Sequence, residues 1–173
     1  MQSNQQIHLC GDILSAHNNR DLKALLMSEI VTEIETRQAA IIEEFADFSD
    51  WQEKYEYIIE LGFDLPALDD KYKNEEHRII GCQSNVWLHA DYEPQQHVML
   101  YEADSDSMIV KGLVSMLVQV LNQQKPEDII TAKLDFLNHI GLDRHLSSTR
   151  SNGLASMVKE MKQQAALHVS SAV

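Results

Sequence analysis

The chain contains little cysteine: its 173 residues include two, Cys10 and Cys82, which lie far apart. A chain of this length can bury a sizeable core without covalent cross-links, so a disulfide framework is not expected. No segment approaches the roughly 18 apolar residues that cross a bilayer, and the N-terminus lacks the apolar stretch of a signal peptide. We therefore predict a protein of the reducing cytoplasm that has no membrane association.

Basic residues are also scarce. The sequence has 14 Lys+Arg against 27 Asp+Glu, which gives a formal net charge of −13. Such a charge repels the phosphate backbone of nucleic acids, so neither DNA nor RNA is an expected partner. The acidity is compatible with simple solubility and with electrostatic steering of a protein partner.

Proline and glycine, with three and six residues, leave few breaks in the helical patterns of the first third of the chain. Apolar residues recur at helical spacing from Glu29 to about Asp47 and predict an amphipathic helix. A second helix follows, with Ser49 as its expected N-cap, Gln52 completing a capping box and Gly62 ending it. Residues 1–28 show only weak periodicity and are interpreted as an extension, so a single domain over 29–173 is predicted.

The middle of the chain has the composition of a small sheet. Residues 63–76 are rich in polar residues and predict a loop. Three segments with β-branched and aromatic residues follow, with a turn at Glu93-Pro94 between the last two; these strand candidates are 77–80, 85–90 and 97–103. The short connections favour an antiparallel arrangement.

Helical patterns return after this sheet. Asp104, Ser105 and Asp106 are typical N-capping residues for a largely apolar helix over about 107–122, which we expect to be central. Short helical turns are predicted from Pro126 and over 135–140, and an amphipathic helix near the C-terminus. The expected fold class is α+β, a small antiparallel sheet of about three strands packed against helices.

Cys82 lies between two strand candidates, in the segment Gly81-Cys82-Gln83-Ser84. Glycine permits a tight connection there, and the polar side chains of Gln83 and Ser84 can donate hydrogen bonds to a thiolate. A buried, inert cysteine also fits the local sequence, because free cysteine behaves as a small hydrophobe. The segment alone leaves both interpretations open.

Four blocks in order and spacing resemble the SufE family, including its CsdE branch, over about Glu29 to Gln164. The blocks are WQEKYEYIIELG (51–62), IIGCQSNVWL (79–88), ADSDSMIVKGL (103–113) and HLSSTRSNGLASM (145–157). The resemblance implies a SufE-like α+β fold, similar to that of the IscU scaffold. Residues 1–28 lie outside it.

The resemblance also implies residue roles. Cys82 matches the cysteine that accepts sulfane sulfur as a persulfide. Asp106 matches an aspartate near the cysteine loop, which we expect to keep that loop closed, and Arg150 matches an arginine that we expect to stabilise the thiolate or dock the partner. From the residues alone, Asp106 can equally be a helix cap, and Arg150 can pair with a carboxylate. We further expect the Cys82 side chain to rest in a shallow apolar pocket between transfers.

The expected partners follow from the same resemblance. They are a cysteine desulfurase of the SufS or CsdA type, which contains pyridoxal phosphate and which this protein would stimulate, and a SufBCD-like scaffold complex that receives the sulfur. The protein itself is expected to need no cofactor and to have no stand-alone catalytic activity. The type of desulfurase, the final sulfur recipient and the oligomeric state, a homodimer included, stay open.

Two other functional classes lack the residues that they would need. An iron–sulfur scaffold needs about three or four cluster ligands, which Cys82 and Cys10 cannot supply, and His8 with Cys10 lacks a second ligand pair for a metal. A stand-alone thiol enzyme would need a second cysteine or a base for Cys82, and none of the eight histidines is placed by spacing as that base.

Overall fold

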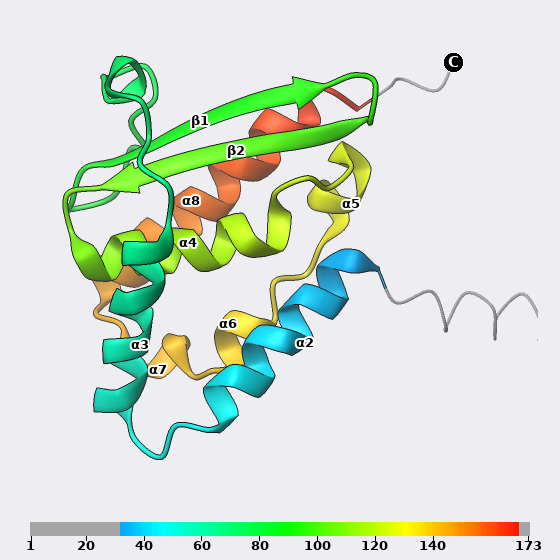
Figure 1. The fold of residues 1–173 in the computed structure, drawn as a ribbon. Coiled ribbons are helices and arrows are strands. Elements are labelled where there is room, and N and C mark those ends of the chain that lie inside the picture. Colours follow the sequence, from blue (N-terminus) through cyan, green and yellow to red (C-terminus); the bar gives the residue numbers. More distant parts are fainter. Residues whose placement is uncertain (1–31, 170–173) are drawn as a thin grey trace, which may run out of the picture. The chain divides into compact units, whose positions relative to one another are not determined.

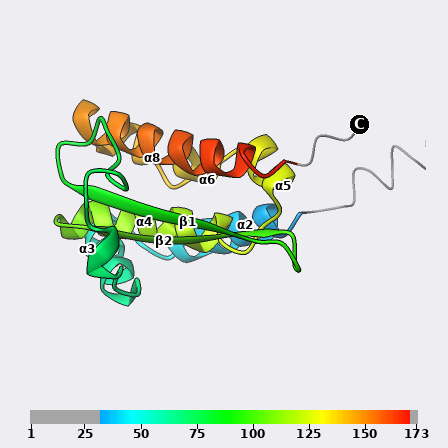
Figure 2. The ribbon, with the colours of Figure 1, turned by 90° about the horizontal axis from the view of Figure 1, so that it is seen from above.

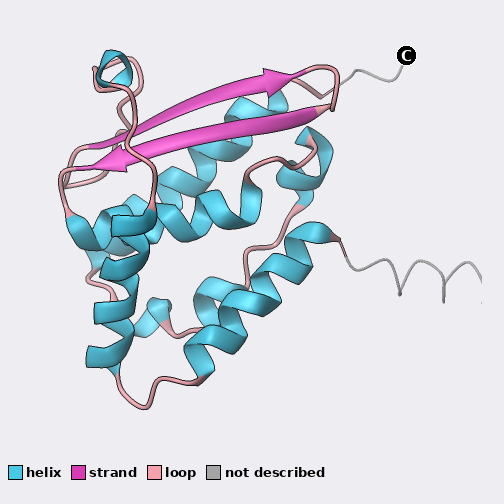
Figure 3. Ribbon diagram, viewed as in Figure 1, coloured by secondary structure: helices cyan, strands magenta, loops and turns pink. Residues whose placement is uncertain are grey.

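The computed structural model describes residues 32–169 and shows an α+β arrangement, as predicted (Figures 1 and 3). The predicted domain boundary at residue 28, Cys10 and His8 lie outside the described residues. In chain order the elements are α2 (Glu33–Ala46), α3 (Trp51–Asp64), the 3₁₀ turn η1 (Asp70–Tyr72), β1 (Val86–Glu93), β2 (Val98–Ser105), α4 (Met108–Leu121), α5 (Pro126–Thr131), α6 (Phe136–His139), α7 (Leu142–His145) and α8 (Ser148–Ala166).

The sheet consists of two antiparallel strands, so it is smaller than the three-stranded sheet that the sequence suggests. β1 and β2 pair in a register that sets Val86 opposite Ser105 and Glu93 opposite Val98. The first strand candidate, 77–80, forms only an isolated bridge between Arg78 and Trp87. Two backbone hydrogen bonds hold it to β1, and the chain then turns at Gly81, which leaves no length for a ladder.

One face of this hairpin packs on α4. Its inward side chains are buried, and α4 is buried along nearly its whole length, as expected for a central helix. Seen from above, the hairpin lies over α4, with α8 running along the side of the hairpin (Figure 2). The Tyr101 hydroxyl joins the sheet to α8 by donating to the Met161 carbonyl at 2.7 Å. The buried hydroxyl is satisfied by this bond, as a core position requires.

The outer face of the hairpin is partly covered by the loop that contains η1. The Tyr72 ring stacks on the His89 ring with 3.6 Å between centroids. Lys73 from the same loop lies 3.0 Å from the buried carboxylate of Asp104, which also pairs with Lys111 of α4 at 3.0 Å. The predicted loop is therefore ordered by contacts with β1 and β2.

Helices α3 and α4 cross closely at two glycines. A Cβ on Gly112 would lie 1.8 Å from the Ile58 carbonyl oxygen, and one on Gly62 would lie 2.9 Å from the Gly112 nitrogen. Gly62 lies inside α3, which continues to Asp64, so the prediction that Gly62 ends this helix is wrong. The local pattern of a C-terminal stop was outweighed by tertiary packing, because only glycine lets the two backbones approach this far.

The predicted helix caps also need correction. α3 begins after Asp50, whose carboxylate accepts from the Glu53 backbone N–H, while the Glu53 carboxylate accepts from Ser49. The capping box is thus shifted by one residue from the predicted Ser49 and Gln52. The N-cap of α4 is Ser107, and it makes no side-chain cap hydrogen bond.

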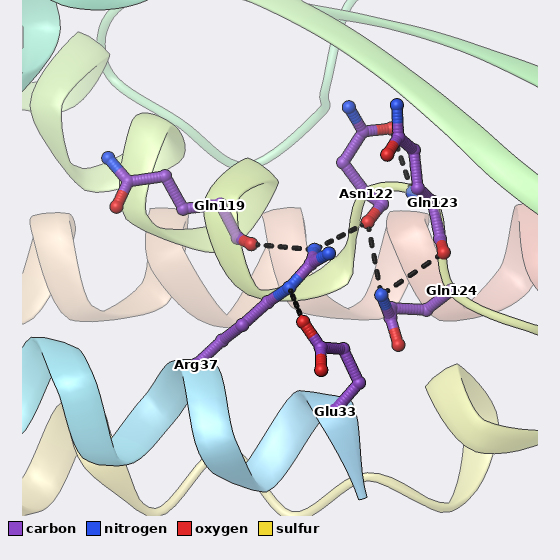
Figure 4. A network of polar contacts seen from close by, with 6 residues as sticks. All are labelled: Glu33, Arg37, Gln119, Asn122, Gln123 and Gln124. Atoms are coloured by element: carbon purple, nitrogen blue, oxygen red, sulfur yellow. Dashed lines mark hydrogen bonds and ion pairs between the residues drawn. The ribbon is translucent and has the colours of Figure 1, made fainter.

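Helix α2 is attached to the end of α4 by Arg37 (Figure 4). Its guanidinium donates to the carbonyl oxygens of Gln119 and Asn122 at 3.0 and 2.7 Å, and also to the Glu33 carboxylate. A cation at these last carbonyls is favourable because they carry the negative end of the helix dipole. Among the described helices, none has the length and apolar character needed to span a membrane.

Candidate functional site

Cys82 occupies the tip of the short connection that precedes β1. The connection is closed by a hydrogen bond from the Ile79 N–H to the Val86 carbonyl at 2.8 Å. Gly81 makes the turn with φ of 101°, a left-handed conformation that glycine adopts without steric cost. Cys82 is half-buried, so its thiol is less exposed than a loop tip suggests.

Helix α8 supports the cysteine from one side. The Cys82 thiol donates to the Gly153 carbonyl oxygen at 3.6 Å, and a Cβ on Gly153 would lie 3.0 Å from the Cys82 Sγ atom. One helical turn later, Ser156 approaches the same loop, since a Cβ on Gly81 would lie 2.8 Å from its Oγ atom. Loop and helix therefore fit together through one glycine on each side.

A cavity of about 300 Å³ opens beside the sulfur. Apolar side chains from α4 and α8 form part of its wall, and the polar residues come from the cysteine loop and the first turns of α8. The residues that line it are Cys82, Gln83, Ser84, Val110, Leu113, Thr149, Arg150, Gly153 and Met157. The volume is much larger than the roughly 30 Å³ that one water molecule occupies in the liquid, so an additional sulfur atom fits.

Arg150 is brought to the same cavity as Cys82 although 68 residues of sequence separate them. It lies in the first turn of α8, behind the N-cap Ser147, and its side chain is exposed. Its guanidinium forms no ion pair or hydrogen bond with any residue within 32–169. It is therefore available to an anion at the cavity or to a partner.

Asp106 is placed at the base of the cysteine loop rather than in the cavity. Its two carboxylate oxygens accept from the backbone N–H of Asn85 at 3.0 Å and from its Nδ2 at 2.7 Å. The Asp106 N–H in turn donates to the Asn85 carbonyl at 3.2 Å. Asp106 thus holds the end of the loop against the start of α4, and it does not cap that helix.

Comparisons with known proteins identify the family of this chain. A family model described as SufE, Fe–S metabolism associated domain, matches residues 39–165. The chain belongs to the SufE family. An uncharacterized SufE-like protein of Rhizobium etli is 39% identical over 128 residues, which cover 72% of this chain and 86% of the relative. Another, from Rhizobium meliloti, is 38% identical and is covered over 91% of its length.

Two further matches extend the comparison of this SufE-family chain. SufE-like protein 1, chloroplastic/mitochondrial, of Arabidopsis thaliana is 36% identical over 80% of this chain, which spans only 37% of that longer relative. The solution structure of a hypothetical protein from Thermus thermophilus superposes with a TM-score of 0.64. It covers 78% of this chain and 97% of its own, and at 19% identity it supports the fold alone.

The environment of Cys82 in this SufE-family protein favours the protonated thiol. Burial raises the pKa of Cys82, because a thiolate loses solvation when it leaves water. The thiol also donates its hydrogen bond to the Gly153 carbonyl oxygen, a contact that only the protonated form can make. The resting thiol is thus a weak nucleophile, and movement away from Gly153 would make it a better one.

Sequence reasoning missed the two residues that seat the loop. Gly153 lies inside a helix, where glycine is unfavourable relative to alanine, and this cost was the available signal of a close contact. Asn85 was expected only as the start of a strand, and nothing local indicated that its side chain would reach Asp106. The buried Asp104 between Lys73 and Lys111 was likewise expected only as a possible cap.

Proposed function

We propose that this protein is a sulfur acceptor and carrier in iron–sulfur cluster assembly, with Cys82 as the residue that carries sulfane sulfur. The observation that carries the proposal is the position of the Cys82 thiol at a loop tip, beside a cavity with room for a further sulfur atom. The family model connects SufE domains with Fe–S metabolism in general. The specific role of sulfur carrier goes beyond that description.

The proposed transfer exchanges one sulfur–sulfur bond for another. The Cys82 thiolate attacks the outer sulfur of a persulfide on the desulfurase cysteine, so that a bond from Cys82 Sγ to that sulfur forms. The bond between the two sulfurs of the desulfurase persulfide breaks, and the desulfurase cysteine leaves as a thiolate. Electrons balance without an external oxidant, and the proton of the Cys82 thiol is released to solvent or to the leaving thiolate.

Arg150 and Asp106 receive different roles in this proposal. Arg150 lines the cavity beside Cys82 and can stabilise the attacking thiolate or contact an acidic group of the desulfurase. Asp106 keeps the loop closed through Asn85, which holds the thiol, and later the carried sulfur, against α8. Closure protects the sulfur from reductants between transfers.

The partners in the proposal are a desulfurase of the SufS or CsdA type and a SufBCD-like scaffold complex. The cytoplasm stays a prediction for the compartment, since the name of the plant relative places that protein in the chloroplast or mitochondrion.

The test combines the protein with a purified cysteine desulfurase and free cysteine. We expect faster sulfide release in the presence of a reductant and a mass increase of one sulfur atom on the peptide that contains Cys82. Cys82→Ser should fold normally and show neither effect, because a hydroxyl is a far weaker nucleophile. Sulfur carried on Cys10 with Cys82 unlabelled, or activity without the desulfurase, would contradict the proposal.

A further inference from the structure

Gly153 makes a contact with Cys82 that no other helical glycine in the described residues makes with a thiol. A Cβ built on it would lie 3.0 Å from Cys82 Sγ but 3.7 Å from both Cα and Cβ of Cys82. The last two distances are ordinary van der Waals contacts, whereas the first is too short for carbon and sulfur. Of these three atoms, the sulfur is therefore the one that would have to move if residue 153 carried a side chain.

The cost of this glycine falls on helix α8. Gly153 is the sixth residue of a 19-residue helix, where alanine would be favoured by its smaller loss of backbone entropy. Gly153 is buried, so exposure to solvent does not explain why a glycine is found at this helical position. The close approach of the sulfur does, because alanine would remove the space in which the thiol rests.

We infer that Gly153 is a positioning residue for the sulfur chemistry of Cys82, holding the thiol in its inward, hydrogen-bonded position. Its missing side chain makes room for Sγ, and its carbonyl accepts the thiol proton at 3.6 Å. A methyl group at residue 153 would displace the sulfur, and the sulfur can yield by rotating about the Cα–Cβ bond toward the solvent. The thiol can thus keep its inward position because residue 153 has no Cβ atom.

This inference rests on the proposed function of Cys82, but it is tested on the free thiol without any desulfurase. In Gly153→Ala we expect iodoacetamide to alkylate Cys82 at least about threefold faster at neutral pH, which corresponds to about half a pKa unit. The pH midpoint of alkylation should also fall, because an outward thiol is better solvated. Arg150 is the single charged residue among those lining the cavity, and it is unchanged in this variant.

The control is Asn152→Ala, an exposed neighbour in the same helix. It raises helix propensity as Gly153→Ala does, but it introduces no group next to the sulfur. Peptide mass spectrometry reads Cys82 and Cys10 separately, so Cys10 serves as an internal reference. An unchanged rate and an unchanged midpoint in folded Gly153→Ala would overturn the inference.

A second measurement covers the case in which Gly153→Ala does not fold. In a Cys82→Ala background the close contact is gone, so Gly153→Ala should raise the melting temperature there through its helix propensity. Failure to fold in both backgrounds would show that the contact with sulfur is not what requires glycine, and would overturn the inference. If Gly153→Ala exposes the thiol but Cys82 never accepts sulfur, the proposed function fails and the positioning role stands.

Discussion

Replacing Asp106 with alanine should open the cysteine loop and speed the alkylation of Cys82. The substitution removes two hydrogen bonds, at 3.0 and 2.7 Å, from Asn85 to a carboxylate. The bond from the Asp106 N–H to the Asn85 carbonyl involves only the backbone and is retained, as is the bond from the Ser105 hydroxyl to the same carbonyl. The base of the loop is therefore weakened but not lost.

The magnitude follows from these contacts. A hydrogen bond to a charged group contributes about 1.5–3 kcal/mol when it is shielded, but both bonds are exposed and water can replace the carboxylate. We therefore expect about 1–2 kcal/mol for the pair. An energy of this size changes a two-state ratio by roughly 5- to 30-fold. If iodoacetamide reacts only with the open loop, alkylation should accelerate by that factor.

The assay is the rate of alkylation of the Cys82 peptide at neutral pH, with the melting temperature as a check on the fold. Asp106→Asn should give an intermediate rate, because its amide oxygen can still accept one of the two bonds. Glu102→Ala removes an exposed carboxylate from β2, four residues before Asp106, and should leave the rate unchanged. A wild-type rate in folded Asp106→Ala would refute the role of Asp106 in loop closure.

Three further predictions concern other groups. Arg150→Ala should impair sulfur transfer and desulfurase stimulation at an unchanged melting temperature. The control, removal of the exposed Arg144, should impair neither. Stimulation at the wild-type level by Arg150→Ala would contradict the role of Arg150. Asp104→Asn should lower the free energy of unfolding by about 2 kcal/mol in urea at pH 7, less than for a fully buried pair because its lysine partners are partly exposed. Burial opposes ionisation of Asp104, but hydrogen bonds from Lys73 and Lys111 outweigh it and lower the pKa of this carboxyl. The contribution of Asp104 to stability should therefore disappear as the pH falls below about 4. The free energy of unfolding of the variant should accordingly depend less on pH in this acid range. Because the pKa of Cys82 is raised, the folded state holds the thiol proton more tightly than the unfolded state does. The stability of the wild type relative to Cys82→Ser should therefore fall as the pH rises above about 8.5. A stability difference that stays constant with pH would contradict this prediction.

Much of the architecture follows from local patterns in the sequence. Helices α2, α4 and α8 and the short α5 and α6 lie where periodicity and Pro126 predict them, because burial of an apolar stripe and backbone capping act within a few residues. The two longer strand candidates form the hairpin, and the four family blocks identify Cys82, Asp106 and Arg150 as candidates. These inferences needed no knowledge of which segments meet.

Only the tertiary structure decided how the site is assembled. That 77–80 stays a bridge depends on how many hydrogen bonds it makes with β1, and that Gly62 continues α3 depends on the approach of α4. The contact between Gly153 and Cys82 joins residues 71 positions apart, and the cavity beside the sulfur is formed by three separate segments. Periodicity and propensity describe what one segment favours, whereas the position of a thiol, its pKa and its neighbours depend on which surfaces pack together.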